Sequence, residues 1–132
     1  VKLRAFKDYE LTDIHAVANK YTSKLDELKA DLKTPVIPEG FYSSWAQYTI
    51  QLKDEETRNG LQAALKDAGI PSMVYYPKPM HRQEAFAGYE YDDVDFPNTI
   101  KLCDTVLSLP MHPYLNDEDI DLVVDVIKSK LK

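Results

Sequence analysis

The sequence has little of several features that mark common classes of protein. Its only cysteine, Cys103, cannot form a disulfide within the chain, and four glycines leave no glycine-rich loop for phosphate. No run of about 18 apolar residues could cross a membrane. The first residues also lack the apolar centre of a signal peptide. These absences predict a cytoplasmic protein with no membrane partner and argue against the nucleotide-binding folds that use glycine-rich loops.

Positive charge is also scarce. The chain has 16 Lys and Arg against 22 Asp and Glu, which gives a formal net charge of -6. A surface this acidic repels phosphate backbones unless a local basic patch overrides it, so we expect no nucleic-acid partner. Its 132 residues, 44% hydrophobic and 29% charged, are typical of one compact domain with a modest core.

Residues for metal binding or nucleophilic catalysis are few and poorly spaced. His81 and His112 lie far apart in the chain, and no CxxC or HxxxH pair is present. Cys103 lies in an apolar helical stretch, which is typical of a small buried residue rather than a nucleophile. No serine lies in a GxSxG motif. We therefore expect no metal site and no catalytic residue, and we interpret His112 as a structural cap of a turn.

A long amphipathic helix is predicted near the start of the chain. Apolar residues recur at steps of three and four from Leu11 to Leu32, and Thr12 is the expected N-cap. Prolines and a glycine within residues 35–40 then end helical structure. Because the outer surface of this helix has no obvious partner, we expect further structure upstream of it.

The rest of the chain alternates strands with helices. Residues from Ser43 to Lys53 alternate in polarity, with Trp45 on the polar face. Asp54 is the expected N-cap of a helix that ends at Gly69. Asn116 is the expected N-cap of the last helix. Further elements are expected as strands at 70–76 and 105–109, an irregular loop at 77–95 and a short helix from residue 97. The predicted fold is α/β (α+β), with about three strands in a sheet covered by helices.

One segment concentrates groups that bind ligands. Residues 75–83, with the sequence YYPKPMHRQ, bring two tyrosines, two cations and a histidine into an otherwise acidic chain. Lys78 and Arg82 can donate hydrogen bonds to phosphate, and the tyrosines offer rings and hydroxyls to a sugar or a base. Because successive strand residues point to opposite faces, only one tyrosine needs to face a ligand. From the residues alone, an anion-binding site and a purely structural segment are equally good interpretations.

Three motifs, in matching order and spacing, resemble one protein family. They are SWAQYTI at 44–50, GIPSMVYYPKPMH at 69–81 and VLSLPMHP at 106–113. Together they resemble the C-terminal part of DegT/StrS-type nucleotide-sugar aminotransferases, and the similarity runs from about Leu3 to Leu131. The resemblance implies a homodimeric pyridoxal phosphate enzyme of fold type I. Such enzymes move an amino group, usually from glutamate, onto a nucleotide-linked ketosugar, in polysaccharide biosynthesis among other pathways.

The resemblance also implies a division of the chain. In that family the Schiff-base lysine and most cofactor contacts lie in a large N-terminal domain, which this sequence lacks. We therefore expect a connecting helix at 1–34 and a small C-terminal domain at 35–132, with no pyridoxal phosphate held by this chain.

The resemblance further implies which residues contact the substrate. Tyr75 and Tyr76 occupy substrate-contacting positions, although many members have His where Tyr75 stands, and Lys78 and His81 belong to the same loop. The small domain closes one side of the active site, and alone it is expected to be inactive. The alternative is a non-catalytic module that binds a nucleotide sugar or another protein.

Overall fold

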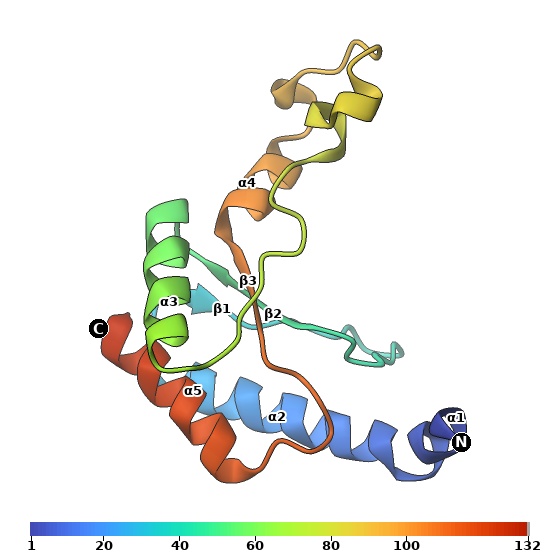
Figure 1. Cartoon of the computed structure of the whole chain (residues 1–132), viewed down its shortest axis with the longest axis vertical. Helices are drawn as coiled ribbons and strands as arrows, with labels where there is room; N and C mark the ends of the chain where they lie inside the picture. Colours follow the sequence, from blue (N-terminus) through green and yellow to red (C-terminus); the bar gives the residue numbers. More distant parts are fainter. Residues whose placement is uncertain (132) are drawn as a thin grey trace.

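The computed structural model describes residues 1–131 and contains a three-stranded antiparallel sheet with helices packed against it (Figure 1). The strands are β1 (Leu32–Lys33), β2 (Tyr48–Leu52) and β3 (Val106–Leu109), in the spatial order β1-β2-β3. The longer helices are α2 (Leu11–Glu27), α3 (Glu55–Asp67), α4 (Pro97–Thr105) and α5 (Asp117–Lys130). The predicted fold class is confirmed. Over residues 1–131, no helix is long and apolar enough to span a membrane.

The first helix begins before Thr12, its expected N-cap, and ends at Glu27, sooner than Leu32 or the expected bound at residue 34. The short helix α1 (Lys2–Ala5) and a π-helical segment (Phe6–Glu10) lead directly into α2. Thr12 therefore lies inside the helix, and its prediction as N-cap is wrong. At the other end, Lys29 adopts a left-handed φ of 51° and Leu32 pairs with Leu52. Leu32 continues the three- and four-residue spacing of the helix but lies in a strand. Periodicity alone cannot show whether such a residue belongs to the helix or to the strand that follows it.

The central strand has the predicted alternation. Tyr48, Ile50 and Leu52 are buried on one face, and their neighbours on β3, Leu109 and Leu107, lie directly opposite the first two. Residues directly opposite in a sheet share a face, so these five side chains form one apolar layer. Burial raises the pKa of Tyr48 to about 12.

Trp45 does not lie on the polar face, and that prediction is wrong. The side chain is buried, its backbone has a φ of 50°, and its ring stacks on Tyr48 with centroids 5.6 Å apart. The reason is that regular pairing begins only at Tyr48, so the two-residue period does not extend back to Trp45.

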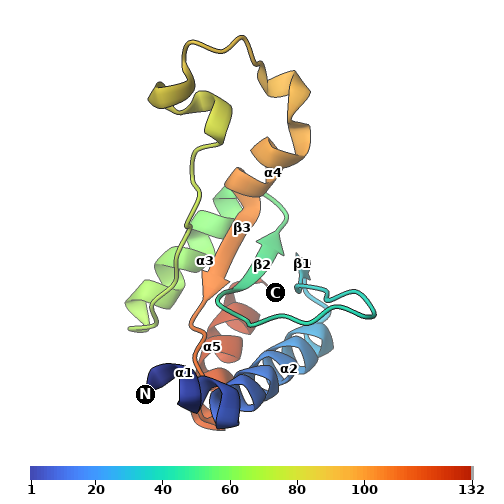
Figure 2. The same cartoon turned by 90° about the vertical axis from the view of Figure 1, so that its right-hand side faces the viewer.

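The predicted strand at 70–76 is also wrong. This segment runs beside β3 (Figure 2), but it pairs there only through the backbone of Met73 and Ser108. The Met73 amide donates to the Ser108 carbonyl at 3.0 Å, and the Ser108 amide donates back at 2.9 Å. Pro71 and Pro77 at its two ends lack the N–H that a longer ladder needs. The third strand is instead β1.

The predicted ends of the later helices are confirmed. Asp54 Oδ1 accepts from the Thr57 amide at 2.8 Å, and Asn116 Oδ1 accepts from the Asp119 amide at 2.8 Å. Gly69 ends α3 with a φ of 74°, because the C-terminal bonds of this helix require a left-handed residue. Pro97 opens α4 as expected.

Helix α5 packs between α2 and α3 and completes the core. Lys20 and Lys24 of α2 form ion pairs with Asp117 and Asp121 of α5. Cys103 is buried, as predicted, and burial raises the pKa of its thiol. The largest fully buried side chains are Tyr21, Tyr48, Leu25, Ile50, Leu61, Leu65, Leu107, Ile120 and Ile127.

Residues 77–96, here called the arm, extend away from the sheet (Figure 1). The arm contains three short 3-10 helices, Met80–Arg82, Glu84–Phe86 and Asp93–Asp95, and is otherwise irregular, as predicted. Several large apolar side chains of the arm are exposed, namely Met80, Tyr89, Tyr91, Val94 and Phe96.

Candidate functional site

A surface hollow of about 300 Å³ lies where the 71–75 segment meets the start of β2 and the end of β3. We call it the Tyr75 hollow. It is lined by Ala46, Gln47, Pro71, Ser72, Met73, Tyr75, Ser108, Leu109, Pro110, Met111 and His112. The motifs at 44–50, 69–81 and 106–113 each contribute part of this lining, so the fold brings three separate sequence motifs together.

The Tyr75 hollow offers uncharged polar groups between apolar walls. Its lining residues with polar side chains include Tyr75, Ser72, Gln47 and His112. The Ser108 hydroxyl is already engaged, because it lies 2.8 Å from the Thr49 hydroxyl. None of its lining residues is Asp, Glu, Lys or Arg, although the chain as a whole is strongly acidic. Such a site suits a polar, acceptor-rich ligand, because no carboxylate in the lining repels it.

Three of the four predicted substrate residues, namely Tyr76, Lys78 and His81, lie outside this lining. Tyr75 is about half exposed and lines the hollow, whereas Tyr76 is more exposed and does not. Lys78 is exposed too, and its carbonyl accepts a hydrogen bond from Gln83 Nε2 at 3.0 Å.

His81 is held inside the arm. Its Nε2 lies 2.9 Å from Asp93 Oδ1, its ring stacks on Phe96 with centroids 5.0 Å apart, and its side chain is only 7% exposed. Arg82 donates from Nε to the same Asp93 oxygen at 2.8 Å. The Arg82 guanidinium, followed by His81, lowers the pKa of Asp93 to about 2. Arg82, a candidate phosphate donor by sequence, is thus already paired.

His81 and Tyr75 face different pockets. The arm has its own apolar pocket of about 410 Å³. It is lined by Met80, His81, Phe86, Tyr91, Phe96 and Thr99. The structure therefore divides the predicted residues: Tyr75 lines the hollow beside the sheet, and His81 anchors the arm.

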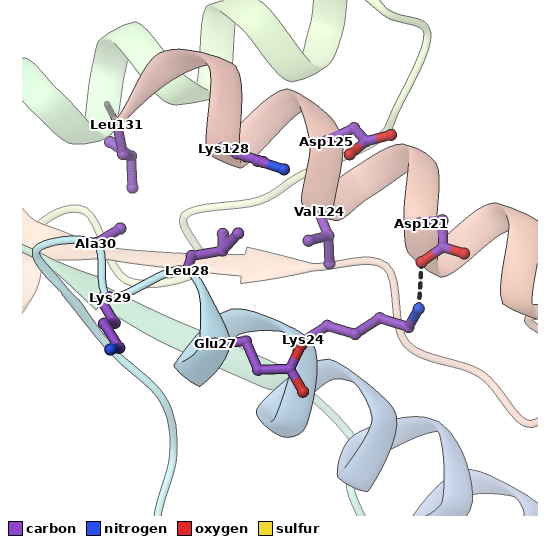
Figure 3. A pocket seen from close by; sticks show the side chains of 10 residues that line it. All are labelled: Lys24, Glu27, Leu28, Lys29, Ala30, Asp121, Val124, Asp125, Lys128 and Leu131. Carbon is purple, nitrogen blue, oxygen red and sulfur yellow. Dashed lines mark hydrogen bonds and ion pairs between the residues drawn. The ribbon is translucent and has the colours of Figure 1, made fainter.

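A further pocket lies between α2 and α5, and Figure 3 shows its lining side chains. Three lysines, Lys24, Lys29 and Lys128, are balanced there by Glu27, Asp121 and Asp125. Lys24 is also paired with Asp121. Because the charges cancel, this pocket selects neither anions nor cations, and we assign no site to it.

His112 belongs to the Tyr75 hollow, which sequence reasoning missed. The predicted structural role is confirmed, since His112 Nδ1 accepts from the Tyr114 amide at 3.2 Å and caps the turn before α5. The ring also lines the hollow together with Tyr75, 37 positions earlier in the chain. The hints in the sequence are the motif at 106–113, which contains His112, and the prolines Pro110 and Pro113 that restrict the loop around it.

Comparison with known proteins decides the family. The DegT/DnrJ/EryC1/StrS aminotransferase family matches residues 2–128. The chain belongs to this family. It is 42% identical, over 83% of its length, to a pleiotropic regulatory protein of Geobacillus stearothermophilus. It is 35% identical, over 92% of its length, to UDP-2-acetamido-2-deoxy-3-oxo-D-glucuronate aminotransferase of Pseudomonas aeruginosa.

The fold agrees with a solved structure of the family. A DegT DnrJ EryC1 StrS aminotransferase from Brucella abortus superposes with a TM-score of 0.86 at 38% identity, over 98% of this chain. The match covers 33% of that chain, and the two relatives above are covered over 29% and 32% of their lengths. The chain thus spans about a third of the length of these family members.

Pyridoxal phosphate, the cofactor of aminotransferases in this family, does not fit the residues described here. It requires a lysine for the Schiff base and an acidic partner for its ring nitrogen. The Tyr75 hollow has neither. Through residue 131, every lysine is exposed except Lys24, which is partly buried and paired with Asp121. The same residues contain no group of three or more His, Cys, Asp or Glu that could hold a metal ion.

Proposed function

We propose that this chain is the substrate-closing domain of a pyridoxal phosphate-dependent aminotransferase that acts on a nucleotide-linked ketosugar. The observation that supports this proposal is the Tyr75 hollow, where all three family motifs meet around neutral hydrogen-bonding residues. The proposed connecting segment covers residues 1–34, of which the helical part ends at Glu27 and Leu32–Lys33 form β1, and the proposed small domain covers residues 35–132. The lysine and the cofactor contacts are supplied by a further domain, and the amino donor is glutamate.

The proposed substrate carries a uridine diphosphate. The P. aeruginosa relative, 35% identical, is named for a UDP-linked 3-oxo sugar acid. Tyr75 supplies a phenol hydroxyl to the sugar nucleotide within the hollow, and the exposed Tyr76 adds a second contact from outside it. Lys78, also exposed, provides a positive charge near the diphosphate.

His81 contributes to the proposed site through the position of the arm. Its Nε2 is engaged by Asp93 and its ring by Phe96, so the ring fixes the arm that carries Lys78. We propose that the arm and its exposed apolar side chains pack on the cofactor-binding domain of the complete protein, a cytoplasmic homodimer.

Kinetics of the complete protein test this proposal. The assay follows 2-oxoglutarate formed from glutamate with UDP-2-acetamido-2-deoxy-3-oxo-D-glucuronate as acceptor. Tyr75→Phe and Tyr76→Phe should raise the KM for the sugar nucleotide and leave pyridoxal phosphate binding, followed by absorbance, unchanged. Unchanged kinetics in both variants would remove the site assignment. The 132-residue chain alone should neither bind pyridoxal phosphate nor transfer an amino group, and activity of this chain alone would refute the proposal.

A second candidate function is a non-catalytic module that binds a nucleotide sugar. One observation favours it, namely that the hollow has no lysine for pyridoxal phosphate. The coding sequence upstream of Val1 separates the two candidates. A large domain with a lysine after a serine-rich turn supports the enzyme, and its absence from the gene and from any companion polypeptide supports the binding module.

A further inference from the structure

We propose that His112 is a substrate-contacting residue, which donates a hydrogen bond from Nε2 to a diphosphate oxygen of the nucleotide sugar. This inference rests on the proposed function and adds His112 to its substrate contacts. The sequence gives His112 only a structural role, as the cap of a turn. It starts from the two nitrogens of the ring. Nδ1 is occupied as an acceptor, because the Tyr114 amide donates to it at 3.2 Å. In the neutral ring the proton therefore lies on Nε2, which becomes a donor.

Backbone restraints and one hydrogen bond limit how the exposed His112 ring can turn. Pro110 and Pro113 on either side restrict φ, and the Tyr114 amide fixes the ring through Nδ1. Tyr114 is itself tied down, since its hydroxyl donates to the carboxylate of Glu10, which is 3% exposed. A donor that is already oriented binds a ligand oxygen with less loss of side-chain entropy than a free side chain does.

The surroundings of the ring favour an anionic oxygen. His112 shares the Tyr75 hollow with the Tyr75 hydroxyl and the Gln47 amide, and no carboxylate lines it. A phosphate oxygen that enters the hollow therefore meets hydrogen-bond donors and no negative side chain. Charge-assisted bonds of this kind are stronger than bonds between neutral groups.

Two substitutions separate binding from turn capping. In His112→Asn the amide oxygen can accept from the backbone amide two residues ahead, as Nδ1 does now, but the Nε2 donor is lost. His112→Ala removes both functions. If His112 only caps the turn, the Asn variant of the complete protein should behave like wild type. If it also binds substrate, this variant should keep the wild-type Tm and lose affinity for the ligand.

The measurement is the inhibition constant of three probes for the complete protein: UDP-N-acetylglucosamine, UDP and uridine. We expect His112→Asn to weaken binding of the first two probes by about tenfold to a hundredfold, the value of one hydrogen bond to a charged group, and to leave binding of uridine unchanged. An equal loss for uridine would overturn the assignment to the diphosphate. Wild-type constants in His112→Asn, together with a raised KM in Tyr75→Phe, would overturn this inference and leave the proposed function intact. If neither His112→Asn nor Tyr75→Phe weakens binding of the nucleotide sugar, both this inference and the proposed function are refuted.

Discussion

The hydroxyl of Tyr114 donates a hydrogen bond to the carboxylate of Glu10, a residue 104 positions earlier in the chain. Lys2 donates to the same oxygen. These donors, Lys2 first and Tyr114 second, hold the pKa of Glu10 below its ordinary value. Glu10 lies in the π-helical segment that precedes α2, and Tyr114 lies in the loop that supplies Pro110 and His112 to the Tyr75 hollow. The pair thus ties the first helix to one wall of the candidate site.

Breaking this contact should loosen the wall of the hollow. In Tyr114→Phe the buried Glu10 carboxylate loses a donor, so we expect a lower Tm and faster amide hydrogen exchange across residues 110–116. Glu10→Gln should have the same effect, and the double variant should be little worse than either single one, because the residues act as a pair. Tyr76→Phe is the control, since its ring is largely exposed and its Tm should not change. Fully additive losses would show that the two residues are not coupled.

The arm should loosen in acid because of Asp93. Its pKa is lowered to about 2 in the folded chain, from an ordinary value of 3.8, so the stabilisation from Arg82 and His81 is fully present above about pH 4. It is lost as the pH falls toward 2. Amide exchange at residues 80–96, corrected for the intrinsic rate, should therefore rise across this window. In Asp93→Asn the arm should already be loose at pH 6, with no further change in the window. A wild-type arm that stays equally protected from pH 5 to pH 2 would contradict the role of Asp93.

Two glycines give a matched test of backbone conformation. Gly69 ends α3 with a φ of 74°, whereas Gly88 in the arm has no left-handed φ, and a Cβ at either position meets nothing within 4 Å. Gly69→Ala should therefore lower the free energy of unfolding by about 1–2 kcal/mol through strain alone. Gly88→Ala should be neutral or raise it by up to about 1 kcal/mol. Urea denaturation measures both, and equal effects would show that α3 does not end on a left-handed residue.

Local sequence signals predicted the elements whose causes are themselves local. Asp54 and Asn116 cap their helices as expected, and Gly69 terminates one, because a cap depends on residues within one helical turn. The alternation over Tyr48–Leu52 was equally reliable. By contrast, Leu32 and Trp45 were assigned wrongly, because periodicity does not show where regular pairing begins or ends.

The candidate site was predictable only in part, since it depends on contacts between distant segments. Tyr75 was found from the family motif and lines the hollow. His81 was assigned to the same loop, but the sequence could not show that Asp93 and Phe96 hold its ring within the arm. His112 was recognised as a turn cap, whereas its place beside Tyr75 follows from the pairing of Met73 with Ser108. No spacing rule predicts that pairing.

A crystal structure of the complete protein with UDP-N-acetylglucosamine tests the central claim most directly. The account predicts that the ligand occupies the Tyr75 hollow, with an oxygen of the nucleotide sugar within hydrogen-bond distance of the Tyr75 hydroxyl. A ligand bound at full occupancy elsewhere, with the hollow filled only by water, would contradict it.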